Sequence, residues 1–183
     1  MSTKNKDKKV LLHICCAVCA TACVERLKKD GFAVVGYFYN PNIYPEPEYR
    51  QRLAETKRLA EALNFPLIVG KYLPDYWLRQ IQGWEHQPEG GRRCIECFRL
   101  RLVQLKKTAQ TKRIAYFTTT LTISPHKDEV MINEIGANID REQFLVRDFK
   151  KKNGFKRAQK LGEKYDLYHQ NYCGCQYSKK DSV

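Results

Sequence analysis

Short apolar runs alternate with amphipathic segments along most of this chain, and this alternation constrains its fold more than any other feature. Phe32–Tyr39 has the length and the branched and aromatic residues of a buried strand. Strands that alternate with helices form a parallel sheet whose two faces the helices cover. We therefore expect a single α/β domain over residues 10–178, with basic flexible tails at 1–9 and 179–183.

The expected elements follow one another without an internal repeat. The strands are predicted at Val10–Ile14, Phe32–Tyr39, Phe65–Val69, Ile114–Thr118 and Phe144–Val146. The helices are predicted at Ala17–Asp30, Pro47–Leu63, Asp75–Gln82, Ile95–Thr108 and Pro125–Ile135. Ligands of parallel sheets bind beyond the carboxyl ends of the strands, so we expect the functional site there.

The charge of the chain favours a polyanionic partner. It contains 33 Lys and Arg against 20 Asp and Glu, a formal net charge of +13 in 183 residues. The ends are rich in lysine, but Lys106-Lys107, Lys112-Arg113 and Lys150–Lys152 make the body basic too. Such an excess favours nucleic acid before a membrane surface. No stretch has transmembrane length, and His13 interrupts the only run that resembles a signal peptide. We expect a cytoplasmic protein, as a monomer.

Eight cysteines fall into three tight groups, which are Cys15, Cys16, Cys19 and Cys23, then Cys94 and Cys97 in C-I-E-C, then Cys173 and Cys175 in C-G-C. Cysteines that serve only as small apolar residues would be scattered. A cytosolic protein keeps its thiols reduced, so such groups are typical of metal-binding or catalytic sites.

Four of these thiols are expected at the starts of helices. Cys15 and Cys16 follow the first strand, and Cys94 and Cys97 open a later helix. The free N–H groups and the dipole of a helix start stabilise thiolates. Two such ends that converge on four thiolates suit an anionic iron–sulfur cluster. Structural zinc is the alternative, because the two C-x-x-C pairs also supply four thiolate ligands.

The other thiols are predicted to have different roles. Cys19 lies near the expected cluster and could hold a second metal, whereas Cys23, one turn further, is expected in the core. A disulfide between Cys173 and Cys175 would close a small strained ring, and strained disulfides are redox-active. We expect an electron-relay dithiol there, with two further metal ligands or two inert thiols as the alternatives.

Five segments together resemble the cobalamin-independent epoxyqueuosine reductases of tRNA queuosine biosynthesis. In chain order they are L-H-I-C-C-A-V-C at 12–19, F-Y-N-P-N-I-Y-P at 38–45, R-C-I-E-C-F-R-L-R-L at 93–102, F-T-T-T-L-T-I-S-P-H-K at 117–127 and Y-H-Q-N-Y-C-G-C-Q-Y-S at 168–178. They extend over about residues 11–178, and several motifs in one order are more specific than any single C-x-x-C.

The resemblance implies a fold, two metal groups and a redox pair. The fold is that of the adenine-nucleotide alpha-hydrolase-like group (HUP or Rossmann-like). A [4Fe-4S] cluster is implied on the residues that match Cys15, Cys16, Cys94 and Cys97. A mononuclear iron is implied beside it, with Cys19 at its variable ligand position. The redox-active pair matches Cys173 and Cys175. Relatives of this fold that use ATP carry a Gly/Ser-rich loop where this chain has cysteines, so no ATP chemistry is expected.

The function implied is the reductive deoxygenation of epoxyqueuosine to queuosine at the wobble position of tRNA. One oxygen leaves as water, and an electron donor outside the chain supplies two electrons. The basic surface would hold the anticodon stem-loop. Thr119, Thr120, Ser124 and Arg101 are candidate substrate contacts. Two other classes stay open, namely a zinc-containing RNA-binding module without redox activity and a metal-free thiol–disulfide oxidoreductase.

Overall fold

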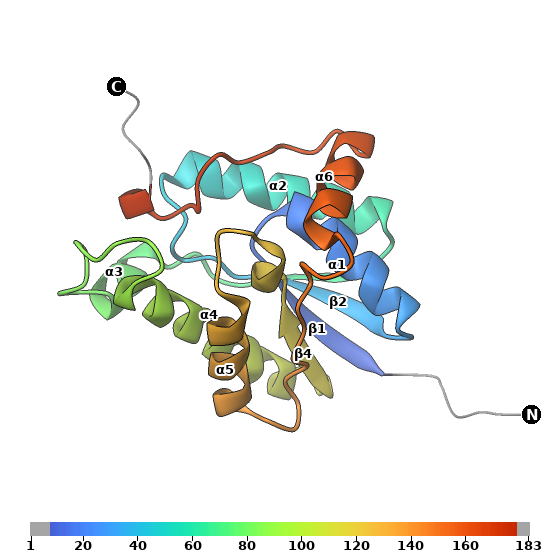
Figure 1. Ribbon diagram of the computed structural model, residues 1–183, viewed down its shortest axis with the longest axis horizontal. Coiled ribbons are helices and arrows are strands. Elements are labelled where there is room, and N and C mark those ends of the chain that lie inside the picture. The colour runs from blue at the N-terminus through green and yellow to red at the C-terminus, as the bar shows by residue number, and fades with distance from the viewer. Residues whose placement is uncertain (1–7, 179–183) are drawn as a thin grey trace, which may run out of the picture.

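A four-stranded parallel sheet forms the centre of the protein (Figure 1), as a computed structural model of the chain describes for residues 8–178. The strands are β1 (Lys9–Ile14), β2 (Ala33–Phe38), β3 (Leu67–Val69) and β4 (Tyr116–Thr119), and their order in the sheet is β3-β2-β1-β4. β1 pairs with β2 from Lys9↔Ala33 to Ile14↔Phe38 and with β4 on its other side. Its side chains are buried from Val10 onward because helices cover both faces of the sheet.

The helices lie on the two faces of the sheet (Figure 1), as expected. One face is covered by α1 (Ala17–Lys29), α2 (Glu46–Ala62) and α6 (Gly154–Lys164), and the other by α4 (Arg92–Thr111) and α5 (Glu129–Ile139). The short helix α3 (Pro74–Gln80) and the 3-10 turns η1 (Thr120–Ile123) and η2 (Gln176–Ser178) complete the described elements. The predicted fold class, a parallel α/β sheet with helices on both faces, is confirmed.

The apolar side chains form a separate core on each face. The first core packs Leu12, Ile14 and Val24 against Leu59 of α2 and Leu161 of α6. The second lies between the sheet and helices α4 and α5. It contains Leu11, Leu102, Leu105, Phe117 and Ile132. None of the described helices combines the length and the apolar character that crossing a membrane requires.

The structure corrects several predicted boundaries, of which three bear on the fold. Phe144–Val146 is no strand, since it makes a single bridge, Phe117↔Phe144, before the chain leaves the sheet and exposes Val146. The helix predicted from Pro125 begins at Glu129, because Asp128 accepts a hydrogen bond from the N–H of Met131 and caps it. Lys9 belongs to β1 and not to a tail. Residues 1–7 and 179–183 of the predicted tails lie outside the described residues.

Helix α6 was not predicted. Its buried residues, Gly154, Ala158, Leu161 and Gly162, recur at intervals of three or four, so the sequence does contain the periodicity of a helix here and the prediction overlooked it. Small residues are needed because α6 packs closely on α1. A side-chain carbon added at Gly162 would lie 3.1 Å from Val18 of α1.

Candidate metal centre

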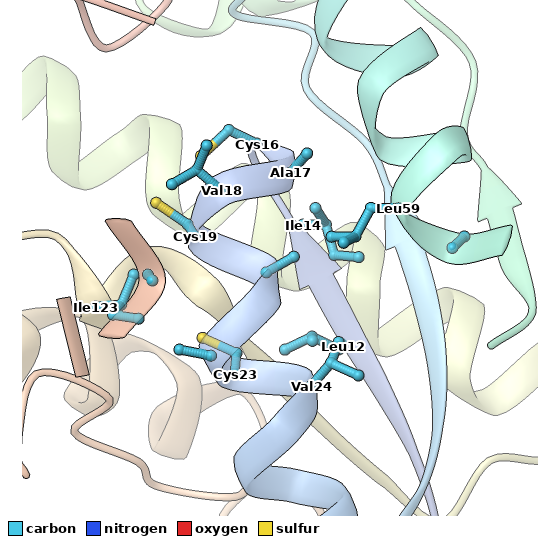
Figure 2. Close-up of a cluster of buried hydrophobic side chains, with 14 of the residues drawn as sticks. Leu12, Ile14, Cys16, Ala17, Val18, Cys19, Cys23, Val24, Leu59 and Ile123 are labelled. Atoms are coloured by element: carbon cyan, nitrogen blue, oxygen red, sulfur yellow. The ribbon is translucent and has the colours of Figure 1, made fainter. Parts of the chain in front are cut away.

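Three thiols gather where β1 ends and α1 begins. Cys15 follows the strand directly, Cys16 is the extended N-cap of α1, and Cys19 lies in its first turn. Their three sulfur atoms lie within 4.8 Å of one another, close enough to share a metal. Figure 2 shows Cys16 and Cys19 at the start of α1 and Cys23 one turn further along it, among core side chains. The prediction that Cys23 is a core residue is confirmed, since it is fully buried.

The first turns of both cysteine-bearing helices have free N–H groups. No side chain caps α1 or α4, and neither first turn contains an acidic residue. Cys94 and Cys97 lie in the first two turns of α4, as the sequence predicts. The N–H of Gly90 also points at Cys94, with its nitrogen 3.3 Å from the sulfur. Free amide donors and two helix dipoles therefore favour negative charge on these thiols.

The three thiols of α1 share their protons unequally. Hydrogen bonds from the thiols of Cys16 and Cys19 hold the pKa of Cys15 well below its usual value. The same interaction with Cys15 raises the pKa of Cys16 to about 12. It also raises the pKa of Cys19, and burial adds to that rise. One thiolate is thus stabilised by hydrogen bonds from two thiols. A metal ion that binds all three sulfur atoms would displace the protons of the two thiols.

Buried polar side chains lie at the carboxyl ends of β1 and β4, next to Cys15. The hydroxyl of Thr120 accepts a hydrogen bond from the Cys15 N–H (3.4 Å) and lies 3.5 Å from its sulfur. Nδ1 of His13 lies 2.9 Å from the hydroxyl of Thr119, and Nε2 accepts from Arg101 Nε (3.3 Å). Burial, with the charge of Arg101, lowers the pKa of His13 to about 3, so its imidazole is neutral. His13 is therefore a buried core residue whose two ring nitrogens have hydrogen-bond partners.

Arg101 connects Cys97 to these buried polar side chains. Its guanidinium lies one helical turn beyond Cys97, with Nη1 3.9 Å from the sulfur, and its Nη2 donates to Oδ1 of Asn40 (2.8 Å). Burial raises the pKa of Cys97, and the charge of Arg101 opposes that rise. Asn40 in turn donates to the carbonyl of Ile14 at the end of β1 (2.9 Å). Hydrogen bonds through Arg101 and Asn40 thus connect Cys97 of α4 to the end of β1, where Cys15 follows.

The C-G-C pair approaches the same place from the far end of the chain. Cys175 packs in a small buried cluster with Cys97, Trp77 and Ile81. Burial raises the pKa of Cys94, and the charge of Cys173 adds to the rise, so Cys173 lies within electrostatic reach of that ligand candidate. Both thiols of the pair are free in this structure. Seven of the eight cysteines therefore meet at the carboxyl edge of the sheet.

Lys127 supplies a cation beside these thiols. Burial alone would lower the pKa of its ammonium group, but the charges of Cys173, Cys15 and Cys19 outweigh that effect and raise it. The side chain is half-buried, at the end of the loop that follows η1. Sequence reasoning missed both Lys127 and Asn40. Their position after β4 and β2 could have revealed them, because both follow carboxyl ends of strands.

The predicted substrate contacts differ in accessibility. Thr119, Thr120 and Arg101 are at most 2% exposed, and their polar groups bind protein partners. Ser124 is half-buried, and its hydroxyl accepts from the N–H of His126 (3.3 Å). Ser124 is thus the one member of this group with a surface that a ligand could meet in this structure.

The thiols fit an anionic metal centre. Soft thiolate ligands suit zinc, copper(I) and iron–sulfur clusters. The sulfurs of Cys94 and Cys97 do not belong to the group within 4.8 Å, so the described thiols form a close triad with two further thiols nearby. Fold and site together define the class of this protein, a parallel α/β protein with a cluster of thiols that could hold a metal at the carboxyl edge of its sheet.

The comparisons with known proteins agree with this class. The sequence model of the family described as Epoxyqueuosine reductase QueH matches residues 10–181. Among proteins of that name, the one from Streptococcus pyogenes is 38% identical over 180 residues, which are 93% of this chain and 70% of the relative. The one from Acinetobacter baylyi is 35% identical and covers 97% and 83%, and the one from Thermotoga maritima is 30% identical and covers 92% and 89%.

A solved structure with the same fold is the U34-tRNA thiolase NcsA from Methanococcus maripaludis with its [4Fe-4S] cluster. It superposes with a TM-score of 0.55 at 12% identity, over 96% of this chain and 63% of that one. At this identity the likeness concerns the fold alone. The chain belongs to the epoxyqueuosine reductase QueH family, a family of oxidoreductases, as the match over residues 10–181 shows. The resemblance stated from the sequence is thereby confirmed.

Proposed function

We propose that this protein reduces epoxyqueuosine in tRNA to queuosine, with residues 10–178 acting as one domain. The epoxide loses its oxygen as water, a carbon–carbon double bond forms, and the reaction consumes two electrons and two protons. The observation that carries the proposal is the family match over residues 10–181, because it contains every cysteine of the three groups.

The proposed ligands of a [4Fe-4S] cluster are Cys15, Cys16, Cys94 and Cys97, and Cys19 is the proposed ligand of an adjacent iron. Such a cluster supplies electrons one at a time, and a neighbouring iron polarises an oxygen as a Lewis acid. The free first-turn N–H groups of α1 and α4 favour the thiolate form of these ligands. Thr120 holds Cys15 at its backbone N–H and lies against its sulfur, so it acts through the ligand and not on the substrate.

Cys173 and Cys175 are proposed to store the reducing equivalents of one turnover. When two thiols join as a disulfide they release two electrons and two protons, the number that one epoxide consumes. An external reductant then restores the dithiol. The contact of Cys175 with Cys97 in one buried cluster supports this role, because it brings the pair next to a proposed ligand. Lys127 lies within electrostatic range of the same thiols, and Lys127 and Ser124, both on the loop after η1, are the proposed polar contacts of the modified base.

The exposed lysines of α6 are the proposed contact with the RNA backbone. Lys156, Lys160 and Lys164 are four residues apart, so they follow one side of the helix at intervals of about 6 Å. None of the ion pairs among residues 8–178 includes them. α6 runs antiparallel to α1, since Arg157 pairs with Glu25 and Gly162 lies beside Val18. The row therefore leads toward the start of α1, where the thiols lie.

A single-turnover assay tests the function. The anaerobically purified and reduced protein is mixed with tRNA that carries epoxyqueuosine, and the nucleosides are analysed by mass spectrometry. Conversion to queuosine that scales with protein concentration is expected. A protein that binds this tRNA and carries its cluster, yet leaves the epoxide intact under reducing conditions, would overturn the proposal. Binding with zinc in place of iron would favour the RNA-binding module.

A further inference from the structure

Arg101 is a buried cation without an anionic amino-acid partner. It is 2% exposed and is among the largest fully buried side chains of the described residues. Its three hydrogen-bond partners are the amide oxygen of Asn40, the imidazole of His13 and the sulfur of Cys97. None of the ion pairs among the described residues includes it.

The other two buried arginines make the distinction clear. Arg52 is equally buried, but its guanidinium forms an ion pair with Glu48 at 2.6 Å. Arg93, next to Cys94, is 3% exposed and donates to backbone carbonyls of the loop before α4. The two buried arginines without a carboxylate thus both lie in α4 beside thiols. The buried arginine with a carboxylate lies in α2.

A buried guanidinium without a counter-charge is costly. Transfer of an ion from water into a protein interior costs several kcal/mol unless an opposite charge offsets it. Neutral hydrogen-bond acceptors satisfy the N–H groups of Arg101 but not its charge. The sulfur of Cys97 lies 3.9 Å from Nη1 of Arg101 and is its one contact among the described residues that can take a negative charge. A thiolate ligand at Cys97 would supply the missing counter-charge.

We propose that Arg101 is the internal counter-cation of the thiolate metal centre, and that its charge stabilises the reduced state of that centre. The assignment rests on the proposed function, since it takes the centre to be the iron–sulfur site. Reduction adds a negative charge near a fixed positive one, so the presence of Arg101 raises the reduction potential. Arg101 is a positioning residue. It is shielded from solvent and acts through Cys97.

Two substitutions separate the charge of Arg101 from its shape. Arg101→Lys keeps a cation on a long stem, and Arg101→Met keeps the length without the charge. Iron and sulfide content and the midpoint potential from an EPR-monitored redox titration are measured on the cluster-containing full chain. We expect the potential of Arg101→Met to shift below that of the wild type, and that of Arg101→Lys to stay near it. Loss of the cluster from Arg101→Met alone would support the proposal equally.

Two results would overturn the proposal. In the first, Arg101→Met retains its cluster at the wild-type potential. In the second, Arg101→Lys and Arg101→Met both lose the cluster while circular dichroism shows an intact fold. Cluster retention would then depend on the geometry of the guanidinium group and not on its charge. The control is Arg26→Met, which removes a half-buried cation that donates to the carbonyls of Asp148, Phe149 and Lys151, in the last turn of α1 away from the thiols. It should lower the melting temperature without a shift of the potential.

The same experiment distinguishes this proposal from the proposed function. A wild-type protein whose cluster potential depends on the charge at position 101, but which does not convert epoxyqueuosine, would refute the function and leave the counter-cation in place. A wild-type protein that holds no cluster, even after reconstitution, would refute both. Conversion of epoxyqueuosine with equal potentials in the wild type and Arg101→Met would refute the counter-cation alone.

Discussion

The thiols of α1 and the C-G-C pair meet at one edge of the sheet, but different physical causes hold them there. Cys15, Cys16 and Cys19 are positioned by the end of a buried strand and the first turn of a helix, which are local features. Cys173 and Cys175 lie in irregular chain. Arg52 donates to the carbonyl of Cys173 (3.2 Å), and the carbonyl of Gly174 accepts from the N–H of Tyr44 (2.7 Å). The first group depends on secondary structure and the second on long-range contacts.

This difference suits the thiols of α1 to metal binding and the C-G-C pair to the delivery of electrons. A metal centre needs ligands held firmly in place, and a strand and a helix provide that. A dithiol that exchanges electrons must open and close, and a loop fixed by a few hydrogen bonds suits such a change. The comparison predicts that substitutions in the two groups have separable effects on metal content and on turnover.

The largest effect is expected for the ligands of α1. Cys16→Ser replaces a soft thiolate with a poor ligand for iron, so iron and sulfide should fall to background and activity should disappear. Cys23→Ser is the matched control on the same helix. It should lower stability by about 1–3 kcal/mol, because it buries a hydroxyl, and should retain the iron. Full iron content in Cys16→Ser, measured by metal analysis after anaerobic purification, would contradict the assignment.

The next effect concerns the C-G-C pair. Cys175→Ala should keep its iron and convert epoxyqueuosine in excess dithionite, which can reload the cluster with the second electron, but should lose multiple turnover when a dithiol compound is the only reductant. Rapid-quench single-turnover and steady-state assays check this. Loss of iron from Cys175→Ala would indicate that Cys175 is a metal ligand, and it would contradict the separate roles of the two thiol groups. Undiminished steady-state turnover with the dithiol compound in the double variant Cys173→Ala/Cys175→Ala would refute the proposed role of the pair in electron transfer.

A smaller effect is expected at Gly174. Its φ of +112° disfavours any other residue, and an added side-chain carbon would lie 3.0 Å from Ile43 and 3.1 Å from Arg52. Gly174→Ala should therefore destabilise the fold by about 2–3 kcal/mol in chemical denaturation. Gly31→Ala is the control, because Gly31 also has a positive φ, +86°, but no neighbouring atom within 4 Å. It should cost about 1 kcal/mol. Equal costs for the two variants would show that the contacts at Gly174 do not hold the segment.

The smallest effect is expected at the RNA surface beside α1. Lys156→Glu/Lys160→Glu should weaken tRNA binding and reduce the slope of log affinity against log salt by about 1–2, because two phosphate contacts are lost. Lys107→Glu/Lys112→Glu, at the end of α4 remote from its cysteines, should change the slope less. Filter binding at several salt concentrations measures both. A larger change of the salt slope in the α4 variant would indicate that the RNA binds on the other face of the sheet.

The sequence predicts the local features of this molecule better than the long-range ones. The strand that precedes Cys15 and the helix that begins after Cys16 follow from apolar periodicity, and so does the clustering of Cys15 with Cys16. Helix α6 was not predicted, although Phe155, Ala158 and Leu161 recur at helical spacing.

The partners of Arg101 could not be predicted from the sequence. Asn40 is 61 positions away in the chain and His13 is 88. Pattern reasoning named Arg101 as a candidate substrate contact. Only the packed fold shows that the guanidinium group of Arg101 faces inward. It also shows that no buried carboxylate among the described residues balances its positive charge.

The central claim is that the thiols at the carboxyl edge of the sheet hold an iron–sulfur centre. Its most direct test is iron and sulfide analysis of the anaerobically purified protein, with EPR spectra before and after dithionite. The account predicts about four sulfides and at least four irons per chain, together with a signal that appears on reduction. Stoichiometric zinc, and no reducible signal even after reconstitution with iron and sulfide, would contradict it.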